Sequence, residues 1–77
     1  MTKLVPISPN KLIKILENLG FRKVHQVGSH IRFIHPDGRR TTVIMHGNEE
    51  IGAGLLSDIL KQVGLSKEEY EKLRREV

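Results

Sequence analysis

Residues 30–46 read HIRFIHPDGRRTTVIMH, and this stretch predicts a β-hairpin. Pro36 and Gly38 occupy positions that a three-residue hairpin loop with a bulge prefers. If His35 closes the loop opposite Arg39, the register of the two strands is fixed. The expected cross-strand pairs are Phe33 with Thr41, Ile31 with Val43, and His30 with Ile44.

This register divides the hairpin into two faces, because paired residues share a face and faces alternate along a strand. The expected core face carries Ile31, Phe33, His35, Thr41, Val43 and Met45. The more polar face carries His30, Arg32, Ile34, Arg40, Thr42, Ile44 and His46. A slip of one residue would exchange the two sets, so the prediction depends on the loop.

The segment before the hairpin predicts a helix over 9–19 and a strand over 22–27. Ser8 is a typical N-cap, and Pro9 suits the first helical position. Apolar residues recur at helical spacing until Gly20, which favours the left-handed conformation that ends a helix. Gly28 and Ser29 then predict a tight turn between the strand over 22–27 and the strand over 30–35.

The segment after the third strand (40–46) predicts two more helices. Apolar residues at helical spacing indicate a second helix that ends at Gly64. Ser66 and Glu69 form a capping box that begins a last helix. We expect the tail of this helix (71–77) to fray, because it has only Leu73 and Val77 to bury. The expected fold is α+β: α-β-β-β-α with a three-stranded antiparallel sheet and a short extra C-terminal helix.

Length and charge narrow the functional classes. The chain has 77 residues, no cysteine and a net charge of +4, and we expect one domain over 1–77 with a core of about 8–65. Residues 1–47 carry a net charge of +6 and residues 48–77 a net charge of −2. This concentration of positive charge favours a polyanionic partner such as RNA. No apolar run is long enough for a membrane span, and the missing cysteines suit the cytoplasm.

The polar face of the hairpin carries the side chains that metal-free RNA cleavage requires. An imidazole can take a proton from a 2′-OH or give one to the leaving 5′ oxygen. A guanidinium can hold the phosphate as its charge grows. In the expected register, His30 and His46 are diagonal neighbours about 7–8 Å apart.

Other uses of these residues are less well supported by the spacing. The four histidines match neither a helical metal-ligand pair nor a zinc finger, so we expect no metal and no cofactor. Gly52 and Gly54 precede a helix and could offer N–H groups to a phosphate, although such glycines more often only permit a turn. Ser29 and His30 point to opposite faces and do not form a nucleophile–base pair. We interpret His25 and His35 as surface or strand-end residues.

Three runs of sequence together resemble the HicA (YcfA-like) mRNA interferase family. They are LGFRKVHQVGSH at 19–30, RFIHPDGRRTTV at 32–43 and GLLSDILKQVGL at 54–65. The resemblance covers about residues 8–65 and implies a fold like that of double-stranded-RNA-binding domains. It further implies a toxin of a type II toxin–antitoxin system that cleaves mRNA without a metal. The implied partners are mRNA and a HicB-type antitoxin, which forms an oligomer with the toxin and covers its site.

The resemblance also implies roles for individual residues. His30 matches the catalytic histidine, and Gly28 and Ser29 match the motif that shapes the turn before it. His46 matches a histidine that often ends the third strand, and it is a candidate assistant. The family commonly has proline two residues before that histidine, where this chain has Ile44. The candidate RNA-binding residues are Arg32, Arg40, Lys23 and Arg39.

Two other functional classes remain open from the sequence. A non-catalytic double-stranded-RNA-binding module would bind the RNA backbone without cutting it, but such modules favour lysine clusters at a helix N-terminus. The start of the second helix here lacks lysine. A protein-interaction module would use the basic face to dock an acidic partner. Incubation with labelled RNA in EDTA separates the three classes, because only a nuclease cuts and only a binder shifts intact RNA.

Overall fold

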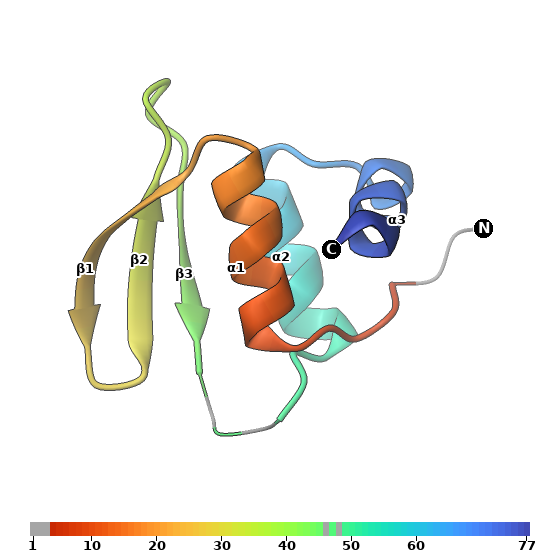
Figure 1. The fold of residues 1–77 in the computed structure, drawn as a ribbon, viewed down its shortest axis with the longest axis horizontal. Coiled ribbons are helices and arrows are strands. Elements are labelled where there is room, and N and C mark those ends of the chain that lie inside the picture. Colours follow the sequence, from red (N-terminus) through yellow and green to blue (C-terminus); the bar gives the residue numbers. More distant parts are fainter. Residues whose placement is uncertain (1–3, 46, 48) are drawn as a thin grey trace.

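The computed structural model of the chain describes residues 4–45, 47 and 49–77 (Figure 1). Its elements are α1 (Pro9–Asn18), β1 (Arg22–Val27), β2 (His30–Ile34), β3 (Arg40–Ile44), α2 (Ala53–Val63) and α3 (Lys67–Glu76). The strands form one antiparallel sheet in the order β1-β2-β3. This arrangement confirms the predicted α+β fold class. None of the helices within the described residues is long and apolar enough to cross a lipid bilayer.

Local signals position α1 as the sequence predicts. The Lys11 N–H donates to Ser8 Oγ at 3.3 Å, and Pro9 is the first helical residue. Gly20 follows the helix with a φ of +101°, which only glycine adopts readily. A Cβ at this position would also lie 3.0 Å from His35 Nε2. Gly20 therefore both ends α1 and allows the hairpin loop to approach.

The β2–β3 register agrees with the prediction at every residue pair of the ladder. Phe33 pairs with Thr41, Ile31 with Val43 and His30 with Ile44. The His35 N–H donates to Arg39 O at 2.8 Å and closes the loop. The strands are slightly shorter than expected and end at Ile34 and Ile44. His46, predicted in the third strand, lies outside the described residues.

The helices cover one face of the sheet and leave the other open. Ile31, Phe33, Thr41 and Val43 are buried on the covered face, as predicted, and His35 and Met45 are half-buried. Thr41 is the only buried polar residue among the described ones, and its hydroxyl donates to Gln62 Oε1 at 2.7 Å. The hydrophobic core also includes Ile7, before α1, and Tyr70, on α3.

β1 departs from a regular edge strand. Its six residues are all exposed, and Figure 1 shows it as the strand farthest from the helices. The β1–β2 register shifts by one residue between Lys23 and His25, which leaves Val24 as the extra residue of a bulge. Arg22 and His25 consequently share the open face of the sheet, whereas Lys23 pairs with Phe33 on the other face.

The prediction that the tail of the last helix frays is wrong. α3 begins at the predicted capping box and continues to Glu76. Tyr70 is fully buried, and its hydroxyl donates to Val5 O at 2.5 Å. Leu73 and Val77 also pack against the core. The expectation counted the tail's apolar residues and overlooked that Tyr70 anchors this helix by its hydrogen bond to the N-terminal segment.

Tyr70 should make stability depend on pH in the alkaline range. Burial raises the pKa of Tyr70 to about 12, whereas an exposed tyrosine has a pKa of about 10. The neutral hydroxyl therefore contributes its full stability below pH about 10, and this contribution is lost as the pH rises through about 12. We expect the wild type to unfold at higher urea concentration than Tyr70→Phe at pH about 9.

This advantage should shrink steadily towards pH about 12, measured by circular dichroism in urea titrations. Lysine titrations occur in both proteins and cancel in the comparison. A difference that stays constant over this range would contradict the buried, neutral state of Tyr70.

Candidate functional site

The open face of the sheet gathers most of the charged residues of the strands. The observed registers place side chains of this face in three rows across β1, β2 and β3. The rows are Val27–His30–Ile44, His25–Arg32–Thr42 and Arg22–Ile34–Arg40. Three arginines and two histidines thus share one face, which contains no acidic residue.

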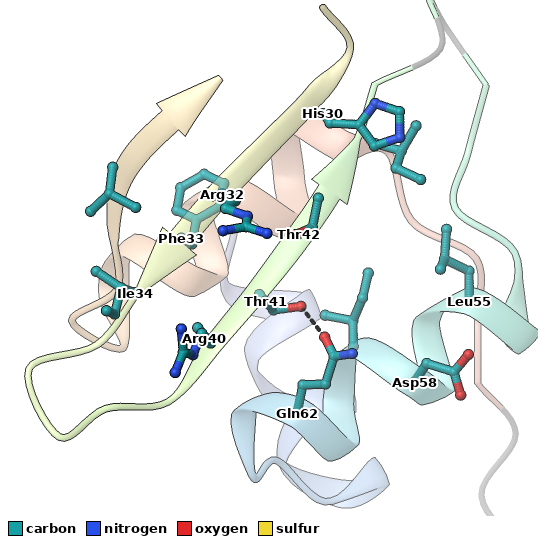
Figure 2. Close-up of a pocket in the computed structure, with 13 residues that line it drawn as sticks. His30, Arg32, Phe33, Ile34, Arg40, Thr41, Thr42, Leu55, Asp58 and Gln62 are labelled. Carbon is teal, nitrogen blue, oxygen red and sulfur yellow. Dashed lines mark hydrogen bonds between the residues drawn. The ribbon is translucent and has the colours of Figure 1, made fainter. Parts of the chain in front are cut away.

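This face forms one wall of a groove of about 850 Å³. The opposite wall is α2, which contributes Leu55, Asp58 and Gln62. Figure 2 shows these three side chains projecting from α2 beside β3, and β2, which carries His30 and Arg32, lies on the other side of β3. The groove is therefore cationic along the sheet and carries its one acidic lining residue, Asp58, on the helix.

His30 is the first residue of β2 and follows a tight turn. Gly28 has a φ of +55°, in the left-handed region that this turn requires. The Met45 N–H donates to Ser29 O at 2.8 Å and ties the turn to the chain just beyond β3. The predicted turn residues thus hold His30 at the end of the groove, with an exposed imidazole. Within the described part of the chain this imidazole has no hydrogen-bond partner.

Arg32 and Arg40 lie on this face at different distances from His30. Arg32 is two residues along β2, which places it about 7 Å from His30 along the strand. Arg40 pairs with Ile34, four residues from His30, or about 13 Å along the strand. One phosphate can therefore contact His30 and Arg32 together, and Arg40 can only reach a phosphate farther along the same backbone.

The other two predicted RNA-binding residues are not brought to this face. Lys23 pairs with Phe33 and lies on the opposite side of the sheet. The Arg39 guanidinium donates to Asp37 and to Val63 O, and it lies 5.3 Å from the centre of the Phe21 ring. The Arg39 N–H, which donates to the Asp37 carboxylate, lowers the pKa of that carboxyl. Arg39 thus joins the hairpin loop to the end of α2.

The two remaining histidines within the described residues, His25 and His35, lie on different faces. His25 lies on the open face beside Arg32, outside the lining of the groove. His35 lies at a strand end, as predicted, but it is half-buried. Its Nε2 donates to Leu19 O at 3.0 Å, and its ring meets the Phe21 ring edge-on at 5.1 Å. Among the described residues, no three His, Asp or Glu side chains are placed to share a metal ion.

Several residues of the open face and of the groove were not predicted from the sequence. A regular β1–β2 hairpin would place Lys23 on the open face, and only the bulge at Val24 brings Arg22 there instead. Asp58 and Gln62 lie on an exposed side of α2, where polar residues are the rule. Their spacing of four residues shows that they share a helix face, but nothing local shows that this face borders the sheet. Gly52, considered for phosphate binding, is the N-cap of α2.

Comparison with known proteins gives a match to a protein family. A family model described as the HicA toxin of bacterial toxin–antitoxin systems matches residues 9–65. This range begins with α1, ends just after α2, and includes the whole sheet and groove. No curated protein matches the chain. α3, which provides Tyr70 to the core, lies beyond the matched range.

Proposed function

Because this chain belongs to the HicA toxin family of bacterial toxin–antitoxin systems, we propose that it is an mRNA interferase that cleaves RNA without a metal ion. As a member of this family it is a toxin and has an antitoxin as its partner. The observation that best supports the proposed activity is the position of His30. Its exposed imidazole shares a cationic groove with Arg32, two residues away on the same strand.

RNA carries its own nucleophile, the 2′-OH beside each phosphodiester. In the proposed reaction O2′ bonds to phosphorus and the bond from phosphorus to O5′ breaks, which yields a 2′,3′-cyclic phosphate and a 5′-hydroxyl. A neutral imidazole takes the proton of the 2′-OH, or an imidazolium gives a proton to O5′. His30 is the only histidine among the described residues that lines the groove. We assign it one of these transfers, with water performing the other.

The spacing on the sheet suggests separate roles for the arginines. A guanidinium that reaches the reacting phosphate stabilises the charge that grows on its oxygens. Arg32 is close enough to His30 to do this, at about 7 Å along the strand. Arg40 lies too far away and would neutralise a flanking phosphate, which contributes to binding. The acid–base group and the phosphate-holding group thus both come from β2.

Removing the imidazole tests the proposed catalytic role. We expect His30→Ala to abolish both growth arrest on expression and cleavage of labelled RNA in EDTA. The fold should persist, because His30 is exposed and contributes nothing to the core. His25→Ala is the matched control, since His25 lies on the same face outside the groove, and it should remain toxic.

A substrate variant tests the same chemistry independently. Replacement of the 2′-OH by hydrogen at the cleaved nucleotide should prevent cleavage there and leave binding intact. Full activity of His30→Ala, or cleavage at the 2′-deoxy position, would overturn the proposal. Intact RNA that shifts in a gel would instead indicate a non-catalytic binding module.

The two arginines should differ in their kinetic effects. We expect Arg32→Ala to lower kcat by about 100-fold, because a lost donor to the transition state costs about that much. Arg40→Ala should mainly raise KM and reduce the slope of log affinity against log salt by about one. Rates of cleavage at several salt concentrations provide both values. Equal losses of kcat in the two variants would contradict the assigned roles.

The same face is proposed to receive the antitoxin, which we expect to be of the HicB type. Val24, which lines the cationic groove, and Val27, on the same strand, have exposed fractions of 56% and 63%. Exposed apolar side chains next to positive charge suit an amphipathic, acidic protein surface. An antitoxin that covers them would block access to His30 and so inhibit the toxin. Both proteins would act in the cytoplasm.

Exposed valines provide a test of this docking face. We expect Val27→Ser to weaken the affinity for the antitoxin several-fold, measured by calorimetry, because buried apolar area is lost. Lys72→Ala on α3 is the control and should retain the wild-type affinity. A Val27→Ser variant with unchanged affinity, together with an antitoxin that leaves RNA cleavage uninhibited, would show that the antitoxin binds elsewhere.

A further inference from the structure

Asp58 is an unusual residue for a groove proposed to bind RNA. It is the only acidic residue that lines the groove, and its side chain is exposed. It forms no hydrogen bond or ion pair with any other described residue, although Arg32 and Arg40 line the same groove. A carboxylate there repels phosphates, so it has no use in binding the RNA backbone. It can, however, accept hydrogen bonds from the N–H groups of a base.

Gln62 provides the complementary group beside it. Asp58 and Gln62 are four residues apart on α2 and therefore neighbours on one face of the helix. The Thr41 hydroxyl donates to Gln62 Oε1 at 2.7 Å, as the dashed line in Figure 2 shows. This bond occupies Gln62 Oε1 and leaves Nε2 without a hydrogen-bond partner among the described residues, on a side chain that lines the groove. Leu55, whose exposed fraction is 42%, adds apolar surface next to them.

Guanine is the base whose Watson–Crick edge best matches the Asp58 carboxylate and the Gln62 amide. That edge carries, in order, one acceptor (O6) and two adjacent donors (the N1–H and the 2-amino group). A carboxylate accepts from both donors, and an amide N–H donates to O6. Adenine, cytosine and uracil each offer only one donor beside an acceptor on this edge. Single-stranded RNA presents its bases in this way, with the base edges free for hydrogen bonds.

We propose that Asp58 and Gln62 form a base-recognition subsite on α2 that selects guanine next to the cleaved bond. This inference rests on the proposed function, because it requires RNA in the groove. The sheet then holds the phosphates and performs the proton transfer, and α2 determines which nucleotide lies beside His30. Asp58 is accordingly a specificity-determining residue.

The experiment uses short unstructured RNAs that contain a single guanosine, or inosine or adenosine at the same position. Inosine retains O6 and the N1–H but lacks the 2-amino group, so it removes one of the two bonds to Asp58. We expect the wild type to cleave beside guanosine roughly ten times faster than beside inosine. In Asp58→Asn the ratio of the cleavage rate beside guanosine to that beside inosine should fall close to one. The Asn amide has one oxygen where the carboxylate has two, so it cannot accept from both the N1–H and the 2-amino group in the same way.

Glu17→Gln is the matched control, because it removes one negative charge from an exposed position on α1 outside the groove. This variant should keep the wild-type ratio. A wild type that cleaves in a His30-dependent way without preferring guanosine would overturn the inference and leave the proposed function intact. An unchanged ratio in Asp58→Asn, with weaker inhibition by the antitoxin, would also overturn it and assign Asp58 to the protein partner. Absence of any His30-dependent cleavage would overturn the proposed function itself.

Discussion

The register of the β2–β3 hairpin is the constraint on which the rest of the structure depends. The His35 N–H bonds to Arg39 O and the Gly38 N–H to His35 O, so the loop sets which residues pair. A shift of one residue would turn Phe33 to solvent and His30 towards the helices. The same bonds that bury the core face therefore expose the catalytic candidate. In this sheet, the β2–β3 register determines both the burial of the core face and the exposure of His30.

Arginine and histidine have different roles in the loop of this hairpin and on its open face. Arg39 and His35, in the loop, bond to Val63 O and Leu19 O and join the sheet to the ends of two helices. Arg32 and His30, on the open face, are free to meet a ligand. The loop brings His35 and Arg39 close to helix carbonyl groups, whereas the side chains of Arg32 and His30 have no hydrogen-bond partner among the described residues. Composition alone could not distinguish these two groups of residues.

Much of the fold could be predicted from the sequence because local chemistry determines it. Capping at Ser8 and Ser66, the glycine after α1 and the Pro-Asp-Gly loop each act over a few residues, and the structure shows each of them. The bulge at Val24 was not predictable, because nothing in a strand of six exposed residues selects one position for it. The fully buried state of Tyr70 was also missed, since its partner Val5 is 65 residues away.

The candidate site, like the fold, could be predicted only where local sequence determines it. Sheet alternation predicts the wall of the groove that carries His30 and Arg32, because both residues belong to one hairpin. The wall that carries Asp58 and Gln62 depends on how α2 lies against β3, which is a tertiary property. A cationic sheet attracts any RNA equally, because every nucleotide has the same phosphate. Selectivity between bases must then come from the second wall, where the groove has its only carboxylate.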